Sequence, residues 1–343
     1  MKKMFWTFLF STIVGNATAL ADEALGEMGV QRLLLEPSFS VTEPKTANFL
    51  LAKALVGFRW KNDAHWWADI TLGNQELIGK PARYGVELSG MGLIEGFGEF
   101  ASGIGNFRAG LVPLDFGLES GAREEQLLFP RSLIYQKRIL GIRDVGFSYY
   151  VSQGFAYTAL TVHNGEGGND LDNRAWLSAK WAYKEKKQEV GISAQVGQTS
   201  PESTNVALDP SLDEFFTTTD KHKMRLSALY GERQHEKWSY SGKVYLAEIL
   251  SENANTRQFG GGTIDFKFSY GPSSHILLRY DEIRFYPLAG RHKEMQITLG
   301  LALHNWNETS RFFIYAIKNL SEPKEVSNDQ LLLTWRYAPR GME

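Results

Sequence analysis

Residues 143–168, RDVGFSYYVSQGFAYTALTVHNGEGG, alternate between apolar and polar side chains on both sides of a short Ser-Gln-Gly break. This alternation predicts two β-strands joined by a tight turn, each strand with one apolar and one polar face. Val145, Phe147 and Tyr149 share the apolar face of the first strand, opposite Asp144 and Ser148. In a soluble sandwich the apolar face would line a core, whereas in a membrane barrel it would face lipid. The rest of the chain has to distinguish these two architectures.

The same unit of about ten alternating residues recurs along the whole chain. Short breaks and longer connections interrupt it in strict alternation. The seven short breaks are at 61–63, 103–105, 152–154, 185–187, 234–236, 271–273 and 305–307. The eight longer connections are near 42–48, 75–91, 118–140, 165–172, 199–221, 250–257, 286–290 and 320–327. This pattern predicts an all-β, antiparallel up-and-down barrel of about 16 strands, with periplasmic turns and external loops. Residues 82–91 fit either a strand extension or the second loop.

Large aromatic residues collect beside the short breaks. A soluble core has no reason to gather them at one end of its strands, whereas a membrane barrel carries an aromatic girdle at each lipid interface. We therefore interpret the repeat as an outer-membrane barrel and expect one rim of the girdle to contain Trp60, Trp66, Tyr149, Tyr157, Trp181, Tyr183, Tyr230, Trp238, Tyr240, Trp335 and Tyr337.

The N-terminus predicts export. Lys2 and Lys3 precede an apolar run, and Ala19-Leu20-Ala21 offers a small-x-small cleavage site, so residues 1–21 are expected to be a signal peptide and 22–343 the barrel. Cysteine is absent and the formal charge is −2. That charge gives no footprint for nucleic-acid binding. We expect the bacterial outer membrane as the location, with lipid and lipopolysaccharide as neighbours.

Two segments resemble the phosphate-selective porin family. RDVGFSYY followed by YTALTVHNGEGGNDLDNR is similar to a family segment through Arg143, Asp144, Gly146, Asn164, Gly165, Asp172 and Asn173, and AGLVPLDFGLES at 109–120 resembles the strand before that family's pore-constricting loop. The resemblance implies a sixteen-stranded, typically homotrimeric porin that passes small anions through a narrowed pore. The family's arginine ladder and lysine cluster cannot be matched to this chain, so phosphate specificity does not carry over.

Alternation also predicts which charged side chains face the barrel interior, where rings of charge select ions. Cations exceed anions in the predicted inward set, which indicates a weak anion preference, although a solvated wall with internal ion pairs explains the same pattern. The expected pore-lining residues are Lys53, Arg59, Arg108, Asp144, Lys180, Arg225, Lys243, Lys267, Arg279 and Arg336. Lys223 is expected on the same face as Arg225.

The loop from Gly117 to Leu140 is the candidate pore constriction because it is long, follows the fifth strand and carries mixed charge. The alternative to a constriction is an ordinary surface loop. The expected constriction residues are Arg123, Glu124, Glu125, Arg131, Lys137 and Arg138.

Signals for an enzyme are poor. GNQELIGK at 73–80 departs from the phosphate-loop pattern, and the seven histidines show no metal-ligand spacing. We expect no catalytic residue, cofactor or metal. The sequence therefore favours a porin, a passive diffusion channel for small hydrophilic solutes. A non-conducting barrel that serves as an anchor or adhesin is the alternative.

Overall fold

The structure is a computed structural model of the 343-residue chain. It describes residues 27–42, 46–62, 65–77, 80–81, 87–88, 91–137, 139–165, 174–199, 221–251, 256–286, 292–304, 309–322 and 329–339. The predicted signal peptide lies outside these residues, as does Arg138.

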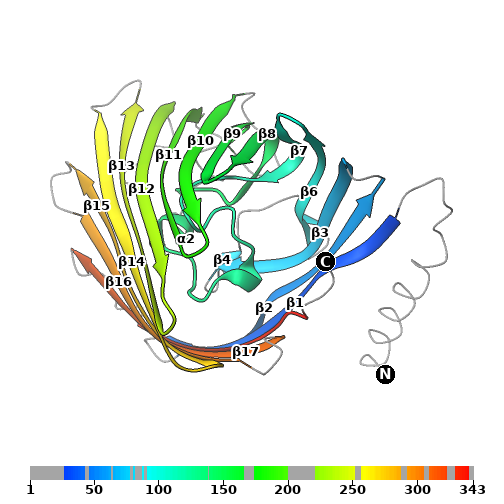
Figure 1. Ribbon diagram of the computed structural model, residues 1–343. Coiled ribbons are helices and arrows are strands. Elements are labelled where there is room, and N and C mark those ends of the chain that lie inside the picture. The colour runs from blue at the N-terminus through cyan, green and yellow to red at the C-terminus, as the bar shows by residue number, and fades with distance from the viewer. Residues whose placement is uncertain are drawn as a thin grey trace.

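Sixteen long strands form one closed antiparallel barrel (Figure 1). Each strand pairs with its neighbours in the chain, β3 pairs with β6, and β1 pairs with both β2 and β18, which closes the ring. Two-residue strands β4 (Lys80–Pro81) and β5 (Glu87–Leu88), within the second loop, pair antiparallel with the ends of β3 and β6 respectively. The long strands are β1 (Glu27–Thr42), β2 (Thr46–Lys61), β3 (Trp66–Leu77), β6 (Met91–Ser102), β7 (Gly105–Pro113), β8 (Arg143–Gln153), β9 (Ala156–His163), β10 (Trp176–Glu185), β11 (Gln188–Thr199), β12 (His222–Gln234), β13 (Trp238–Ser251), β14 (Arg257–Gly271), β15 (Ser274–Tyr286), β16 (His292–His304), β17 (Ser310–Glu322) and β18 (Gln330–Tyr337).

The predicted strand number and the alternation of short turns with longer loops are confirmed. The Ser-Gln-Gly break is a turn, where Gly154 has a positive φ of 60°, a conformation that glycine adopts without steric cost. The strands it joins, β8 and β9, pair from Gln153 with Ala156 up to Gly146 with His163.

The outer wall of the barrel is apolar. On β8, Val145 and Phe147 are 41% and 50% exposed on the outside, whereas Asp144 and Ser148 are almost fully buried on the inside. The same division recurs around the ring, as a barrel in lipid requires. Among the described residues, no helix has the length and apolar character needed to cross a membrane.

Most of the predicted aromatic girdle does face outward beside the short turns, including Trp181, Tyr183, Trp238, Tyr240 and Trp335. Two members were predicted wrongly. Tyr157 shares the inner face of β9 with buried Thr161, and Tyr230 is buried inside at 4% exposure. Tyr230 lies over Gly191 of the neighbouring strand, where a Cβ atom would come within 2.4 Å of its hydroxyl. The aromatic ring therefore fills the space that this glycine leaves on the inner wall.

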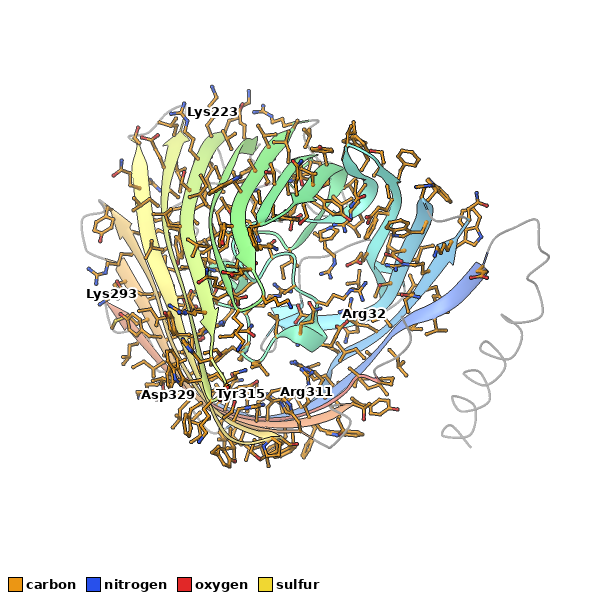
Figure 2. All side chains as sticks on the ribbon, in the orientation of Figure 1. Arg32, Lys223, Lys293, Arg311, Tyr315 and Asp329 are labelled. Carbon is orange, nitrogen blue, oxygen red and sulfur yellow. The ribbon has the colours of Figure 1, made fainter. Side chains whose placement is uncertain are left out.

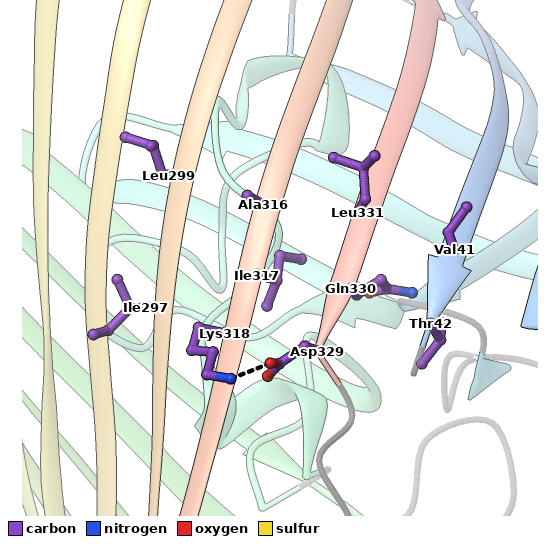
Figure 3. Close-up of a pocket in the computed structure, with 10 residues that line it drawn as sticks. All are labelled: Val41, Thr42, Ile297, Leu299, Ala316, Ile317, Lys318, Asp329, Gln330 and Leu331. Atoms are coloured by element: carbon purple, nitrogen blue, oxygen red, sulfur yellow. Dashed lines mark hydrogen bonds and ion pairs between the residues drawn. The ribbon is translucent and has the colours of Figure 1, made fainter. Parts of the chain in front are cut away.

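The outer wall also has shallow grooves. One of about 540 Å³ lies where β16, β17 and β18 meet β1, and it is lined by apolar side chains together with the ion pair between Lys318 and Asp329 (Figure 3). Lys318 points outward on β17, whose inner face carries buried Tyr315 and Ile317. Charged side chains are thus present on the outside, near the ends of the strands.

Candidate functional site

The long connection between β7 and β8 folds into the barrel instead of over its rim (Figure 1). Its ends are joined at the wall, where the Leu114 amide donates to the Ile142 carbonyl at 2.8 Å. Between them lie a 3-10 turn, η1 (Glu124–Gln126), and a one-turn helix, α2 (Leu133–Gln136). We call residues 114–142 the interior loop; it is slightly longer than the predicted 117–140.

One side of the interior loop is apolar and packs against the barrel wall. Phe116, Ile134 and Tyr135 of the loop belong to one buried cluster with Leu226 of β12 and Phe259 of β14. Tyr135 also donates its hydroxyl to the Phe116 carbonyl at 3.0 Å, which ties α2 to the start of the loop. This side of the lumen is therefore filled by packed side chains.

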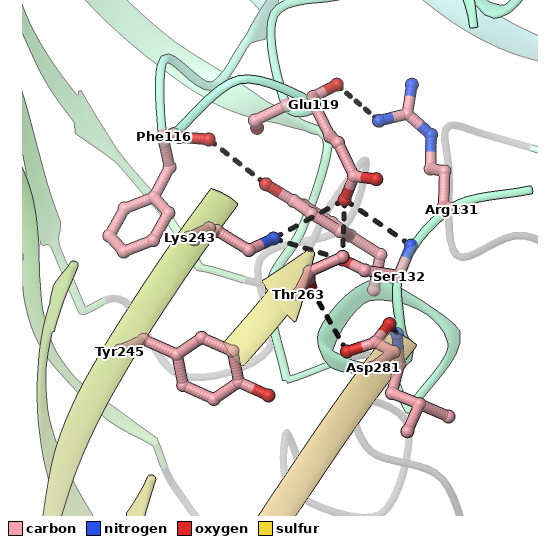
Figure 4. A network of polar contacts seen from close by, with 12 residues as sticks. Phe116, Glu119, Arg131, Ser132, Lys243, Tyr245, Thr263 and Asp281 are labelled. Carbon is pink, nitrogen blue, oxygen red and sulfur yellow. Dashed lines mark hydrogen bonds and ion pairs between the residues drawn. The ribbon is translucent and has the colours of Figure 1, made fainter. Parts of the chain in front are cut away.

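Glu119 is the centre of a buried polar network on the same wall (Figure 4). Its carboxylate lies 2.7 Å from Arg279 of β15 and 3.4 Å from Lys243 of β13, and it accepts a hydrogen bond from the Ser132 hydroxyl at 2.5 Å. Nearby, Asp281 accepts the Leu133 amide at 2.5 Å and thus holds the start of α2. Burial opposes ionisation of Glu119, but the two cations outweigh it and lower its pKa to about 2.

A second network joins the loop to strands β1, β2 and β18. Glu124 lies 2.5 Å from Arg131 within the loop and 3.2 Å from Lys53 of β2. Burial opposes ionisation of Glu124 as well, yet Arg131 and Lys53 hold its pKa well below its usual value. Lys53 also contacts Glu36 at 2.7 Å, and Glu36 in turn pairs with Arg336. The loop is thus fixed to this wall by a chain of alternating charges.

Further bonds come from β1, β16 and β17. Arg311 and Tyr315 of β17 point into the barrel (Figure 2). Arg32 pairs with Glu125 at 2.6 Å, Arg311 donates to the Glu125 carbonyl at 2.7 Å, and Tyr315 donates to the Leu128 carbonyl at 2.6 Å. Lys137 lies 2.8 Å from Glu294 of β16. Because the loop bonds to walls on several sides, it narrows the interior of the barrel.

The inner wall from β2 to β8 carries arginine–carboxylate pairs in two tiers. Arg143 and Glu95 form the tier nearer the loop network, with 2.6 Å between Nε and the carboxylate. The second tier joins Arg59 to Asp69 at 2.7 Å and Arg108 to Glu99 at 2.6 Å. Its arginine side chains keep contact with solvent, at 31% exposure for Arg59 and 20% for Arg108.

Two buried guanidinium nitrogens, one on β1 and one on β8, are unsatisfied by the part of the chain that the structure describes. Arg32 and Arg143 are 5% and 2% exposed, and no described residue accepts a hydrogen bond from the Nη1 atom of either one. A buried donor without a partner costs about 1–3 kcal/mol, so each of these two nitrogens favours an acceptor from outside the protein. Water or a small oxyanion supplies such an acceptor.

The structure places nine of the ten predicted lining residues on the inner face. Five of them, Lys53, Lys180, Lys243, Arg279 and Arg336, are buried contacts of the interior loop, which predicts an anchoring role. The other four inward residues are Arg59, Arg108, Asp144 and Lys267. Arg131 and Glu124 of the predicted constriction are also sealed in the loop's own network, while Arg123, Glu125 and Lys137 are half-buried.

Arg225 was predicted wrongly, and Lys223 with it. Both side chains are exposed on the outer face of β12, where Arg225 lies 3.7 Å from Glu248. The inner face of β12 is apolar instead, because Met224 and Leu226 pack against the interior loop. An outward cation near a strand end costs only about 0–1 kcal/mol, since it reaches the lipid interface.

Four inward carboxylates were missed. Glu36, Glu95, Glu99 and Glu119 are all buried inside and bonded to cations, so the inner wall is much closer to neutral than alternation predicted. In β1, register shifts on either side of residues 32–36 obscure the parity of Glu36. Glu95 and Glu99 alternate with the same parity as Phe97 on β6, and this shared face is the sequence signal that could have identified both carboxylates as inward.

A buried Asp-His-Ser series crosses strands β8, β9 and β10. Nδ1 of His163 lies 2.6 Å from Asp144, and Nε2 lies 2.8 Å from the Ser178 hydroxyl. This is the spacing of a hydrolytic triad. However, the three residues are only 2–3% exposed, so a substrate does not reach Ser178 in this structure. Asp144 also accepts the Gly165 amide at 2.6 Å, and the series therefore secures the start of an external loop.

Comparison with known proteins agrees with this architecture. No family model and no curated protein sequence matches the chain. Solved structures do match in fold. An anion-selective porin from Comamonas acidovorans superimposes with a TM-score of 0.66 at 15% identity, covering 91% of this chain and all of that one. The outer membrane channel DcaP of Acinetobacter baumannii gives 0.68 at 8% identity, with 93% and 99% covered. OmpT, an outer membrane protein of Vibrio cholerae described in a trimer form, gives 0.67 at 10% identity, with 91% and 99% covered. The chain has the fold of an outer-membrane β-barrel.

Proposed function

We propose that this protein is a porin, a passive channel for small hydrophilic solutes with a weak preference for anions. The observation that carries the proposal is the interior loop, which narrows a sixteen-stranded barrel while inner-wall arginines such as Arg59 and Arg108 stay in contact with solvent. Barrels of this strand number enclose an aqueous channel unless something plugs it. Passive diffusion involves no chemical reaction, so we expect no cofactor.

The anion preference rests on the unsatisfied nitrogens of Arg32 and Arg143. Most other inward cations, including Arg59, Arg108 and Arg279, are paired with carboxylates, so the preference is expected to be slight. Constriction residue Arg123 adds a further cation at the loop. Phosphate selectivity in particular has no additional support.

The assembly proposed with this function is a homotrimer in the outer membrane, surrounded by lipid and lipopolysaccharide and exported through a signal peptide at residues 1–21. The trimer is supported by the resemblance to the porin family and by the trimer form of the Vibrio cholerae relative in fold.

The deciding experiment is conductance of the purified, refolded protein in a planar lipid bilayer. We expect discrete conductance steps and, in a salt gradient, a reversal potential displaced slightly toward anions. A barrel that inserts but never conducts would show that the interior loop plugs the lumen. The protein would then be an anchor or adhesin.

A further inference from the structure

The outer wall over strands β10 to β15 carries a groove that is unlike ordinary lipid-facing surface. It has a volume of about 1020 Å³. Its floor follows one row of paired residues across the sheet, and most members of this row are small: Ala179, Ala194, Ser227 and Gly260, with Leu246 between the last two. The row ends at Arg284 of β15.

The side of the groove nearer the short turns is apolar. Trp181, Ile192, Leu229 and Val244 form the adjacent row, and these four side chains are 51–60% exposed. A recess bordered by large apolar side chains accommodates hydrocarbon chains, because contact area is gained without displacing a polar group.

Toward the external ends of the strands the outer wall is charged; Arg284 lines the groove itself, whereas Arg225 and Lys293 lie beside it. Arg284 pairs with Glu282, which also lies 3.4 Å from Lys293, and Arg225 lies 3.7 Å from Glu248. Lys223 and Lys293 extend this edge and point away from the barrel (Figure 2). Among the residues that the structure describes along this edge, four cations therefore face two carboxylates. Arg225 and Arg284 remain 67% and 49% exposed despite their pairs, so their guanidinium groups are accessible to a ligand.

We propose that this groove binds a phosphorylated glycolipid of the outer leaflet, the lipid A part of lipopolysaccharide, with acyl chains in the recess and one phosphate group at each of Arg225 and Arg284, which lie three strands apart. Guanidinium groups are well suited to phosphate because their N–H donors match its oxygens. The depth agrees, since both arginines lie within three residues of the external end of their strands. A second copy of the chain fits less well, because an edge with excess cations repels the same edge of another copy.

The site rests on the outer-membrane placement of the proposed channel but not on conduction. Both arginines lie on the outer wall, so their replacement is expected to leave conductance unchanged. A protein that binds lipid A but never conducts would overturn the porin function alone, and a conducting protein without lipid A binding would overturn this site alone.

Binding is tested by native mass spectrometry of the full chain in detergent, titrated with bisphosphorylated lipid A, dephosphorylated lipid A or inorganic phosphate. We expect the double variant Arg225→Gln/Arg284→Gln to bind bisphosphorylated lipid A roughly tenfold more weakly, since each cation near an anionic headgroup contributes up to about fivefold. The control is Lys186→Gln/Lys187→Gln, which removes two exposed cations from a short turn and should bind normally. Heat-dependent mobility on gels verifies that every variant is folded.

A second variant tests the recess. Ala194→Leu/Ser227→Leu fills the floor with side chains that point outward, and it should weaken both forms of lipid A. The proposal is overturned if the lysine control loses as much affinity as the arginine variant. It is also overturned if dephosphorylated lipid binds equally well, if inorganic phosphate binds alone with the same affinity, or if the arginine variant dissociates an oligomer in the absence of lipid.

Discussion

Arg143 is the single residue that best tests the charge of the interior. Its Nε contacts Glu95 at 2.6 Å, while its Nη1 has no partner among the described residues. Arg143→Gln should move the reversal potential toward cations, because Glu95 is left without its main counter-charge. The double variant Glu95→Gln/Arg143→Gln removes both charges and should return the potential close to the original value.

Arg225→Gln is the matched control for that measurement, since it removes an arginine from the outer wall of the same barrel. It should not change the reversal potential. An equal shift in the Arg225 variant, or no shift in the Arg143 variant, would remove the arginines of the inner wall from the selectivity of the pore. Loss of a buried charge partner also costs about 3–5 kcal/mol, so folding of the Arg143 variant has to be verified by gel mobility.

Asp144 is a residue whose role we predict to be structural. Asp144→Asn disturbs the bond to His163 and the bond to the Gly165 amide. We expect a loss of about 1–3 kcal/mol in the free energy of unfolding, measured by urea titration in lipid vesicles, with conductance unchanged. Ser178→Ala should lower stability less, because it removes one neutral hydrogen bond. Wild-type stability of the Asp144 variant would contradict this account of the series.

At the scale of elements, the interior loop is predicted to loosen in acid. The pKa of Glu119 is lowered to about 2 against burial, by Arg279 and Lys243, and that of Glu124 is lowered too. A lowered pKa means that the stabilisation is complete above the ordinary glutamate value of 4.5 and is lost as pH falls toward 2. Conductance recorded at about pH 3 should therefore become noisier than at neutral pH.

Glu119→Gln is expected to show this noise at neutral pH, because Lys243 and Arg279 lose their shared carboxylate. The variant should depend less on pH than the wild type. Lys186→Gln, at a distant short turn, is a suitable control. If the Glu119 variant remains as quiet as wild type at neutral pH and keeps the full acid response, the glutamate does not hold the loop.

The loop also explains which strand faces could be predicted from sequence. Alternation was correct where one face meets lipid and the other is polar, as in β8. It was misleading for β12, because the inner face there packs against the loop and charge on the outer face costs little near the strand end. The inward position of Tyr230 does have a sequence signal. Its cross-strand partner is Gly191, and this pairing favours a ring folded over the glycine.

For the whole molecule, strand number and order were predictable because each strand pairs with its neighbour and each turn leaves a local signal. The interior networks were not, because their partners are distant in sequence. Arg336 and Glu36 are 300 residues apart, and Arg279 and Glu119 are 160 apart. A single sequence does not specify such pairs until the barrel is closed.

Closure of the barrel leads to the last prediction. β18 (Gln330–Tyr337) pairs with β17 on one side and with β1 on the other, so it is the strand that joins the two ends of the sheet. A chain truncated after Asp329 would leave two unpaired edges in the hydrocarbon region, where each unsatisfied backbone group costs several kcal/mol. We expect no folded band on heat-modifiability gels and no protection from protease in vesicles. A chain truncated after Arg340 keeps all of β18 and should fold normally. Folding of the shorter chain would mean that β1 and β17 can close the ring without β18.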